Sequence, residues 1–299
     1  IINIPEIENL LNLNKTPDIN DNITAYLLIG SDKRDNEDAD NYVDGNRADV
    51  ILLGFFNETI NKNALISIPR DTLVNNSCTG EVERINASYK KNNCGNGAEN
   101  IVAAVNTLTG IKIQHIASFN FDGFETIIDS FDGIEICVDK TQREGFAFEL
   151  QEGCQKVNGS TALNWTRSRN TEVLIGQKII DENGNDNSEW KKMDNVSDLS
   201  RVERQQYLVI QLLSELENFS SFAELLQFIQ ALEETFVVDE GLSVNKATNI
   251  LWDMRTIELD NITKLTIPTS PYELNDGRQV LILNGNFYDF AEENLLIDE

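Results

Sequence analysis

The chain has 299 residues, of which 40% are hydrophobic and 25% are charged, so it is long enough for a sizeable core and has an ordinary globular composition. Fifty acidic residues against 24 basic ones give a net charge of −26. Such a surface repels nucleic acid at long range, which argues against nucleic-acid binding. An anionic substrate would have to be captured by a local basic pocket.

The first 22 residues contain Pro5, Pro17 and many Asn and Asp residues, which predicts a lead-in helix or stalk. No stretch of the chain approaches the roughly 20 apolar residues of a membrane span. Because the sequence opens at Ile1 without a methionine, we expect an excised portion whose N-terminal membrane anchor is missing. A single domain is expected over residues 23–299.

Three apolar runs follow, and each is short and bounded by turn residues, as buried strands are. They are Tyr26–Ile29, Val50–Phe56 and Ala64–Ile68. Further along, the pattern predicts helices near 98–108 and 121–131 and strands at 113–119 and 134–138. Strands that alternate with helices imply an α/β sheet covered on both faces.

The second half begins with a polar segment, residues 170–197, which we expect to be an exposed excursion. An amphipathic helix is predicted from Asp198 to about Leu216. The remaining pattern predicts helices at 221–235 and 243–254, strands near 262–267 and 280–283, and a closing helix near 288–296.

The four cysteines are more consistent with disulfides than with a metal site. The chain has one histidine, His115, and no Cys-x-x-Cys pair, which argues against zinc. Nearest-neighbour pairing, Cys78 with Cys94 and Cys137 with Cys154, is our preferred arrangement among three, and it implies an oxidising, extracytoplasmic compartment. The alternative is four buried, reduced thiols.

Two arginine clusters are candidates for anion binding. Arg201 and Gln205 lie four residues apart on one helix face, with Arg204 beside them, near a helix N-terminus that favours anions. If Trp165–Arg169 is extended, Arg167 and Arg169 point to the same side and grip one anion together. The alternatives are that Asp198 merely caps the helix and that Arg167 and Arg169 are surface residues.

Three aspartates stand next to the predicted strands. Asp32 follows the first run, Asp49 leads into the second, and Asp71 follows the third, directly after Arg70. Two carboxylates together with phosphate oxygens are a usual way of binding Mg²⁺. Taken singly, each aspartate is more often a turn residue or the partner of an arginine.

The sequence motifs resemble the LytR-CpsA-Psr family of cell-wall glycopolymer ligases. The motifs occur in the family's order from about Ile23 to the C-terminus. The matching stretches are Leu27–Arg34, Arg47–Asp49, Leu65–Thr72, Arg84–Asn86 with Tyr89, Phe121–Phe124 with Asp129 and Gly133, Asn158–Gly159, Arg167–Arg169 and Asp198–Gln206. The 28 residues between Arg169 and Asp198 are longer than is usual in the family and are expected to form a flap or loop near the active site.

The resemblance implies a three-layer α-β-α sandwich around a mixed sheet, with a hydrophobic channel for a lipid. It implies a monomeric, membrane-anchored enzyme on the extracytoplasmic face of a bacterial membrane. This enzyme would move a glycopolymer from a polyprenyl-pyrophosphate carrier onto a peptidoglycan hydroxyl, forming a phosphodiester and releasing polyprenyl phosphate. The alternatives are a non-catalytic module that binds the same lipid or polymer, and a prenyl pyrophosphatase that uses water.

Site residues follow from the same resemblance. Mg²⁺, or Mn²⁺ as the alternative ion, would be held by Asp32 and Asp49. The expected catalytic residues are Arg70, Asp71, Arg201 and Asp32, with Asp71 or Asp32 taking the hydroxyl proton. The expected pyrophosphate ligands are Arg47, Arg70, Arg84, Arg167, Arg169, Arg201, Arg204 and Gln205.

Overall fold

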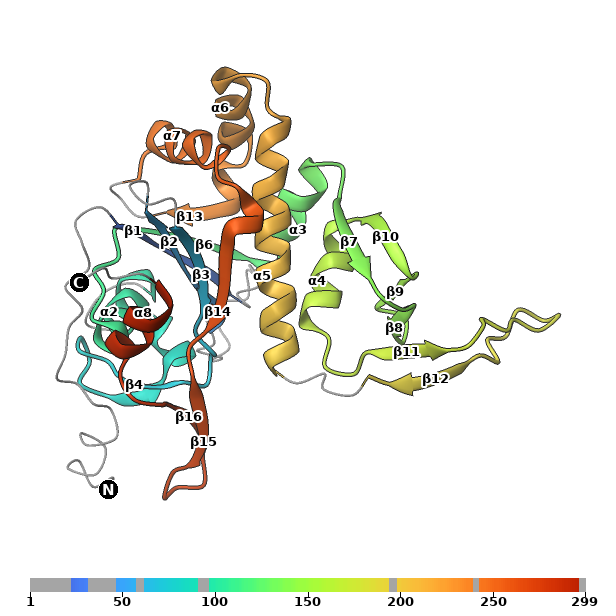
Figure 1. Ribbon diagram of the computed structural model, residues 1–299, viewed down its shortest axis with the longest axis horizontal. Coiled ribbons are helices and arrows are strands. Elements are labelled where there is room, and N and C mark those ends of the chain that lie inside the picture. Colours follow the sequence, from blue (N-terminus) through green and yellow to red (C-terminus); the bar gives the residue numbers. More distant parts are fainter. Residues whose placement is uncertain are drawn as a thin grey trace, which may run out of the picture. The chain divides into compact units, whose positions relative to one another are not determined.

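The computed structural model describes residues 23–31, 47–57, 62–90, 97–193, 198–238 and 242–295. They form two compact units (Figure 1). The first unit contains the described residues up to Phe121 and those from Ser221 onward, and the second is Asp122–Ser220.

The first unit is built on a six-stranded mixed sheet with the order β13-β6-β1-β2-β3-β14. Strand β1 pairs antiparallel with β2 and parallel with β6, and β3 pairs antiparallel with β2 and parallel with β14. The three predicted apolar runs all lie in its central strands. The strands are β1 (Ile23–Ser31), β2 (Ala48–Asn57), β3 (Lys62–Ser67), β6 (His115–Asn120), β13 (Phe236–Val238) and β14 (Ile262–Thr266).

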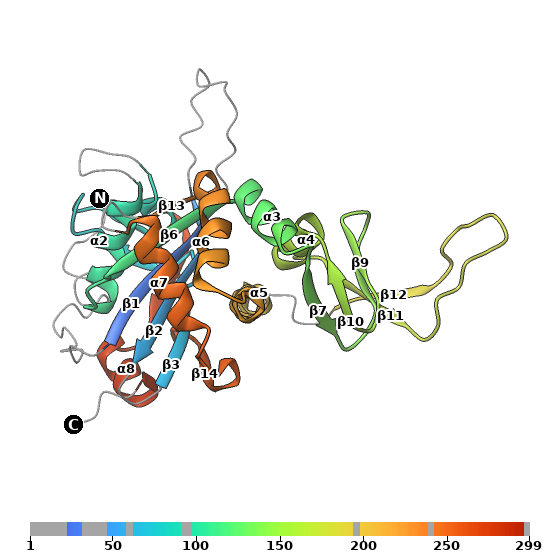
Figure 2. The same ribbon diagram turned by 90° about the horizontal axis from the view of Figure 1, so that it is seen from above.

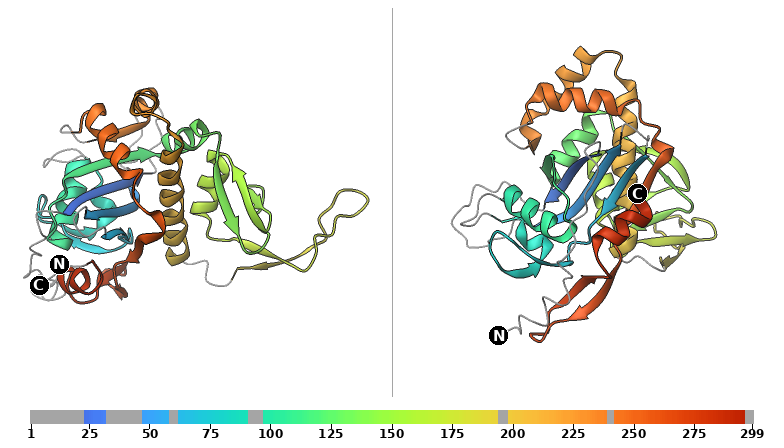
Figure 3. Two further views of the ribbon diagram at one scale, coloured as in Figure 1. Left: turned by 45° about the horizontal axis from the view of Figure 1, so that its top comes forward. Right: turned by 60° about the vertical axis from the view of Figure 1, so that its left-hand side comes forward.

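Helices cover this sheet on both faces. Helices α2 (Gly97–Thr109) and α8 (Phe287–Leu295) lie on one face, and α6 (Phe222–Ala231) and α7 (Val244–Met254) lie on the other (Figures 2 and 3). Alternate residues of β1 are buried and the residues between them are partly buried, so neither face of the strand is fully exposed, as expected between two helical layers. The predicted three-layer α-β-α sandwich is therefore confirmed, whereas the lipid channel stays a prediction.

Most of the apolar core lies on the face of α2 and α8. The side chains of Ala25, Leu27 and Ile29 from β1 belong to one buried cluster with Ile101 of α2 and Phe287 of α8. At roughly 25 cal/mol for each Å² of apolar surface removed from water, such side chains each contribute about 1.5–3 kcal/mol. This cluster anchors β1, β2 and β3, whose ends carry the candidate site residues.

Two short hairpins of the first unit were not predicted as such. Leu281 donates its N–H to the carbonyl of Asp71 at 2.9 Å, which joins the two hairpins beside the Arg70 turn. Leu73, Leu274 and Val280 form a small buried cluster between them. The elements are β4 (Leu73–Asn75), β5 (Val82–Arg84), the 3₁₀ turn η1 (Ile85–Ser88), β15 (Thr269–Glu273) and β16 (Gln279–Leu283), with further 3₁₀ turns η3 (Glu233–Thr235) and η4 (Leu259–Asn261).

The second unit combines three helices with two small sheets. Strand β7 pairs with β10, and a four-stranded sheet has the order β12-β11-β8-β9. The elements are α3 (Phe121–Ser130), β7 (Ile134–Val138), β8 (Gln142–Glu144), β9 (Phe148–Leu150), β10 (Gly153–Val157), α4 (Gly159–Arg167), β11 (Glu172–Ile175), β12 (Glu189–Lys192), α5 (Asp198–Glu215) and η2 (Leu216–Asn218).

The residue pair Asn158-Gly159 is explained by the way helix α4 begins against helix α3. The Asn158 side chain accepts a hydrogen bond from the Thr161 N–H at 2.9 Å and so caps the start of α4. Gly159 lies against the backbone of Glu125 in α3, so closely that an added Cβ would overlap it. Its N–H donates to Asp129 Oδ1 at 2.7 Å. This Asn-Gly pair therefore starts α4 directly on α3.

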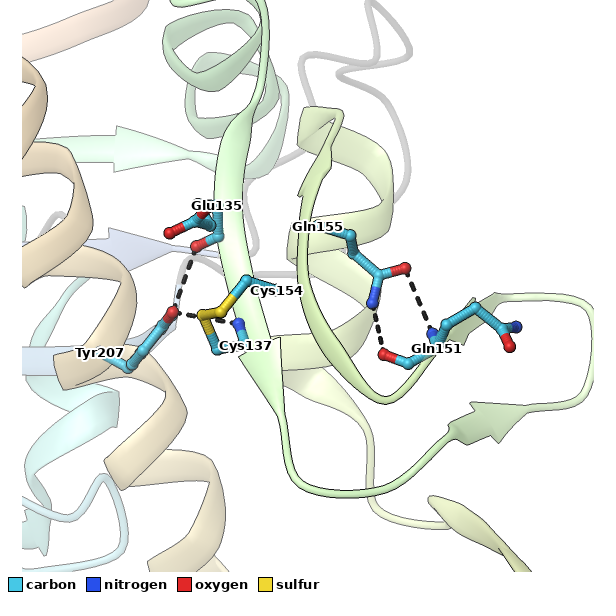
Figure 4. Close-up of a disulfide and its surroundings, with 6 residues drawn as sticks. All are labelled: Glu135, Cys137, Gln151, Cys154, Gln155 and Tyr207. Atoms are coloured by element: carbon cyan, nitrogen blue, oxygen red, sulfur yellow. Dashed lines mark hydrogen bonds between the residues drawn. A yellow bond between two sulfur atoms is a disulfide. The ribbon is translucent and has the colours of Figure 1, made fainter.

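A disulfide joins Cys137 of β7 to Cys154 of β10, as predicted, at directly opposite positions of the two strands (Figure 4). Tyr207 of α5 lies beside it: its hydroxyl accepts from the Cys137 N–H at 3.2 Å and donates to the Glu135 carbonyl at 3.3 Å. Cys94, the predicted partner of Cys78, lies outside the described residues.

The polar segment after Arg169 is mostly exposed, as expected, and it contains a β-hairpin, β11 and β12, that was not predicted. Arg143 of β8 binds it through Glu172 at 3.1 Å and Asp186 at 2.6 Å and stacks 3.8 Å over the ring of Trp190. Hydrogen bonds from Ser188 are the main cause that lowers the pKa of Asp186 to about 2.

None of the helices that the structure describes is both long enough and apolar enough to cross a membrane.

Candidate anion-binding site

A chain of ion pairs runs through the first unit beside the end of β3. Arg70 Nη1 lies 2.5 Å from Asp49 Oδ1, and Arg70 Nε lies 3.7 Å from Asp71 Oδ2. Asp71 Oδ1 in turn lies 3.2 Å from Arg84 Nη1. Arg84 also donates from Nη2 to the carbonyl of Gln279 at 2.7 Å. Four of the predicted site residues are thus brought together from three separate segments.

The turn that presents Arg70 is fixed locally. Thr72 donates to the carbonyl of Pro69 from both its N–H, at 3.0 Å, and its hydroxyl, at 2.6 Å. Proline presets the backbone for such a turn directly after the strand. The side chains of Arg70, Asp49 and Asp71 are each about a quarter exposed, at 24%, 22% and 25%. These side chains are shielded enough from water for strong charge–charge interactions, and they are exposed enough to contact a ligand.

The pairing of β1 with β2 supports the predicted carboxylate pair. Ser31, the last residue of β1, is paired with Ala48, the first residue of β2. Asp49 therefore lies at the sheet edge where β1 ends. Asp32 follows Ser31 in the sequence and lies outside the described residues.

A cavity of about 640 Å³ lies next to this chain of ion pairs. The predicted ligands Arg47 and Arg84 both line it, together with Asn86, Lys90 and Arg278, which were not predicted as site residues. Asn86 belongs to the Arg84-Ile85-Asn86 motif, so the sequence did hold a signal for it. Arg278 comes from the distant β15–β16 hairpin, and no sequence pattern links it to Arg84.

The remaining predicted ligands belong to the second unit. Arg167 is the last residue of α4, and Arg169 follows in the loop, where both are exposed. The condition that Trp165–Arg169 is extended is not met, because capping by Asn158 starts a helix that continues to Arg167. The grip of both arginines on one anion stays a prediction.

Arg201, Arg204 and Gln205 lie in the first turns of α5, as predicted. Arg201 is 8% exposed and Arg204 is 7% exposed, whereas Gln205 is half-buried. Buried arginines are uncommon, because removing a guanidinium from water is costly unless it finds partners. The start of α5 thus holds buried positive charge.

Arg204 finds such partners inside the second unit. It donates from Nη1 to the Trp165 carbonyl at 2.8 Å and from Nη2 to Thr171 Oγ1 at 3.2 Å, and it lies 5.2 Å from the Trp165 ring. Burial lowers the pKa of Arg204 to about 10. Because these contacts fix both ends of the loop that carries Arg167 and Arg169, we interpret Arg204 mainly as a positioning residue.

Replacing Arg204 with methionine is expected to lower the free energy of unfolding by about 2–4 kcal/mol, because two buried acceptors lose their donor. Urea denaturation followed by circular dichroism measures this loss. The matched control is Glu203→Met, an exposed position of the same helix, for which a change below about 0.5 kcal/mol is expected. Equal stability of the two variants would contradict the structural interpretation of Arg204.

The fold defines an α/β protein with arginine–aspartate ion pairs beside the end of β3. The chain belongs to the LytR_cpsA_psr family, since the family model matches residues 6–176 and 188–295. The unmatched residues 177–187 lie between β11 and β12. The family resemblance is thereby confirmed.

Relatives with described roles work on the cell wall. The polyisoprenyl-teichoic acid–peptidoglycan teichoic acid transferase TagU of Bacillus licheniformis is 24% identical over 280 residues, which is 92% of this chain and 74% of TagU. The probable cell wall biosynthesis protein LcpB of Corynebacterium glutamicum is 30% identical over 166 residues, 52% of this chain but only 39% of LcpB. The crystal structure of TagV from Bacillus subtilis shares the fold, with a TM-score of 0.68 and 20% identity over 92% of this chain and 96% of TagV.

Proposed function

We propose that the chain is a phosphotransferase that moves a glycopolymer from a polyprenyl-pyrophosphate carrier onto a peptidoglycan hydroxyl. The products are a phosphodiester and polyprenyl phosphate. The observation that carries the proposal is the series of ion pairs that links Asp49, Arg70, Asp71 and Arg84. It presents two guanidiniums and two carboxylates around one sheet edge. The transferase name of TagU supports the same reaction class.

In the proposed reaction, the acceptor oxygen attacks the sugar-bearing phosphorus, and the bond from that phosphorus to the bridging oxygen breaks. Polyprenyl phosphate leaves with the bridging oxygen. Arg70 neutralises charge that develops on the phosphoryl oxygens, which is where preorganised cations lower a barrier most. The hydroxyl proton goes to a carboxylate, for which the sequence offers Asp71 and Asp32.

The observed contacts distinguish Asp71 from Asp49. Both oxygens of Asp71 face guanidiniums, one of Arg70 and one of Arg84, so we propose that Asp71 mainly orients the two arginines. Only one oxygen of Asp49 lies against Arg70. Asp49 thus offers a hard oxygen ligand of the kind that Mg²⁺ prefers, and it would hold the ion together with Asp32. When bound, Mg²⁺ or Mn²⁺ would add positive charge next to the pyrophosphate.

We propose an extracytoplasmic location for this activity. The disulfide between Cys137 and Cys154 supports an oxidising compartment, because such bonds rarely persist in the cytosol. The cell-wall roles named for TagU and LcpB agree with it. The acidic overall charge of −26 disfavours nucleic acid as a partner.

A turnover assay tests the function. The purified protein is incubated with a prenyl-pyrophosphate-linked saccharide, Mg²⁺ and peptidoglycan fragments, and released prenyl phosphate and saccharide-bearing fragments are measured by mass spectrometry. We expect release that depends on the acceptor and yields the phosphodiester. Release of the same rate without acceptor would instead indicate a pyrophosphatase, and binding without release would indicate a lipid-binding module; either result overturns the transferase proposal.

A further inference from the structure

The basic cavity of the first unit differs in charge from the rest of the molecule. It is formed by the β4–β5 hairpin, the turn η1 and the tip of the β15–β16 hairpin. Four cationic side chains and two carboxylates line it, in a chain of net charge −26. The lining residues are Arg47, Glu81, Val82, Glu83, Arg84, Asn86, Ala87, Lys90 and Arg278.

One of the two carboxylates is already neutralised by the protein. Glu83 is 7% exposed, accepts a hydrogen bond from the Ser88 hydroxyl at 2.9 Å and lies 3.4 Å from Lys90 Nζ. Of the other charged side chains that line the cavity, Arg84 lies 3.2 Å from Asp71 and Arg278 lies 2.8 Å from Asp276, so both of these arginines already face a carboxylate. In the lining itself, four cationic side chains still outnumber two carboxylates, which favours an anion there.

Asn86 supplies a second, independent sign of a ligand. Its backbone N–H donates to the carbonyl of Arg70 at 3.1 Å, which fixes its position against the Arg70 turn. The residue is only 6% exposed and lines the cavity, yet its side-chain amide makes no hydrogen bond with any residue that the structure describes. Its amide atoms are not among the fully buried polar atoms without a partner, so the amide opens onto the cavity and is available to a bound molecule.

We propose that this cavity is a subsite for an acidic saccharide, that is, a sugar unit carrying a carboxylate or phosphate. The inference rests on the proposed function and deepens it. A volume of about 640 Å³ falls within the usual range for a small-molecule pocket. The arginines bind the anionic group. The amide of Asn86 forms a hydrogen bond with a hydroxyl or acetamido group of the sugar, a group that a free phosphate and a lipid tail both lack.

The subsite is connected to the reaction centre. Arg84 lines the cavity and, through Asp71, is linked by ion pairs to Arg70. Asn86 and Ile85 donate their backbone N–H groups to the carbonyls of Arg70 and Thr72. A saccharide seated in the cavity therefore lies beside the residues proposed to activate the phosphoryl group. The acidic sugar belongs either to the peptidoglycan acceptor, as a carboxylate, or to the donor polymer, as a phosphate.

Direct binding tests the subsite without any transfer step. N-acetylmuramic acid, N-acetylglucosamine 6-phosphate and neutral N-acetylglucosamine are titrated against the whole protein by calorimetry. Arg278→Gln is the test variant, because Arg278 is exposed and the change is not expected to disturb folding; Lys264→Gln, an exposed cation on β14 outside the cavity, is the matched control. We expect an acidic sugar to bind at least about tenfold more tightly than the neutral one, and Arg278→Gln alone to abolish most of that preference.

The two sources of the anion give different results. Preference for the carboxylate sugar, with a raised KM for the peptidoglycan acceptor in Arg278→Gln, assigns the cavity to the acceptor; preference for the phosphate sugar, with a raised KM for the donor, assigns it to the polymer. Equal binding of all three sugars, or equal loss in Arg278→Gln and Lys264→Gln, overturns the subsite. Because binding is measured without donor or turnover, a failed transferase assay and a failed subsite are separate outcomes.

Discussion

Replacing Arg70 with alanine is expected to lower the rate of polyprenyl phosphate release by about a hundredfold to a thousandfold while the fold survives. Its guanidinium lies between Asp49 and Asp71, at 2.5 and 3.7 Å, and we propose that it neutralises charge on the transferring phosphoryl group. Its removal leaves the two carboxylates without the cation between them, which adds repulsion toward an anionic substrate.

The measurement is acceptor-dependent release by the purified variant, together with thermal unfolding to show that it folds. Arg70→Lys keeps the charge but loses the planar fork, so we expect it to recover only part of the rate. Lys264→Ala removes a cation from the same unit far from Asp49 in the sequence and should behave as wild type. Wild-type turnover of a folded Arg70→Ala would refute the proposed role.

The sequence was most informative about the central sheet. Strands β1, β2 and β3 lie between two helical layers, so both of their faces are apolar and they stand out as continuous hydrophobic runs. Helices with a clear apolar stripe were predicted to within one or two residues, as α2 and α7 show. When buried residues recur at a regular spacing, the local sequence alone is enough to predict the helix or strand.

The missed elements lack that signal. Strands β8 and β12 consist of Gln142–Glu144 and Glu189–Lys192, which are polar and carry no apolar alternation; β12 is mostly exposed, and β8 buries a polar residue, Gln142. Their existence depends on cross-strand contacts such as that of Arg143 with Glu172. Pairing of this kind is set by tertiary structure, so composition and periodicity could not predict it.

The same distinction holds for the candidate site. Asp49 at the start of β2 and Arg70-Asp71 shortly after β3 are joined in one ion-pair network, as their places beside strand ends suggested, while their catalytic roles stay a prediction. Arg204 was predicted as a pyrophosphate ligand, and its donors bind Trp165 and Thr171. Sequence spacing places a residue on a helix face, but only the packed neighbours decide what that residue binds.

A still larger loss of activity is expected from Arg201→Ala, about a thousandfold or more. Arg201 is only 8% exposed, whereas Arg70 is about a quarter exposed, so its charge is less screened by water. It also lies in the first turn of the 18-residue helix α5, where backbone N–H groups favour an anion. Both effects strengthen its attraction to a pyrophosphate.

Because Arg201 is buried, alanine substitution alone would confuse lost chemistry with lost packing. Arg201→Gln fills more of the space without the charge, and Glu203→Gln changes an exposed residue of the same helix. We expect Arg201→Gln to fold and to lose release and prenyl-pyrophosphate binding together, with Glu203→Gln near wild type in both. If the folded Arg201→Gln binds and turns over normally, the guanidinium of Arg201 does not hold the pyrophosphate, and α5 contributes to the enzyme only through its packing.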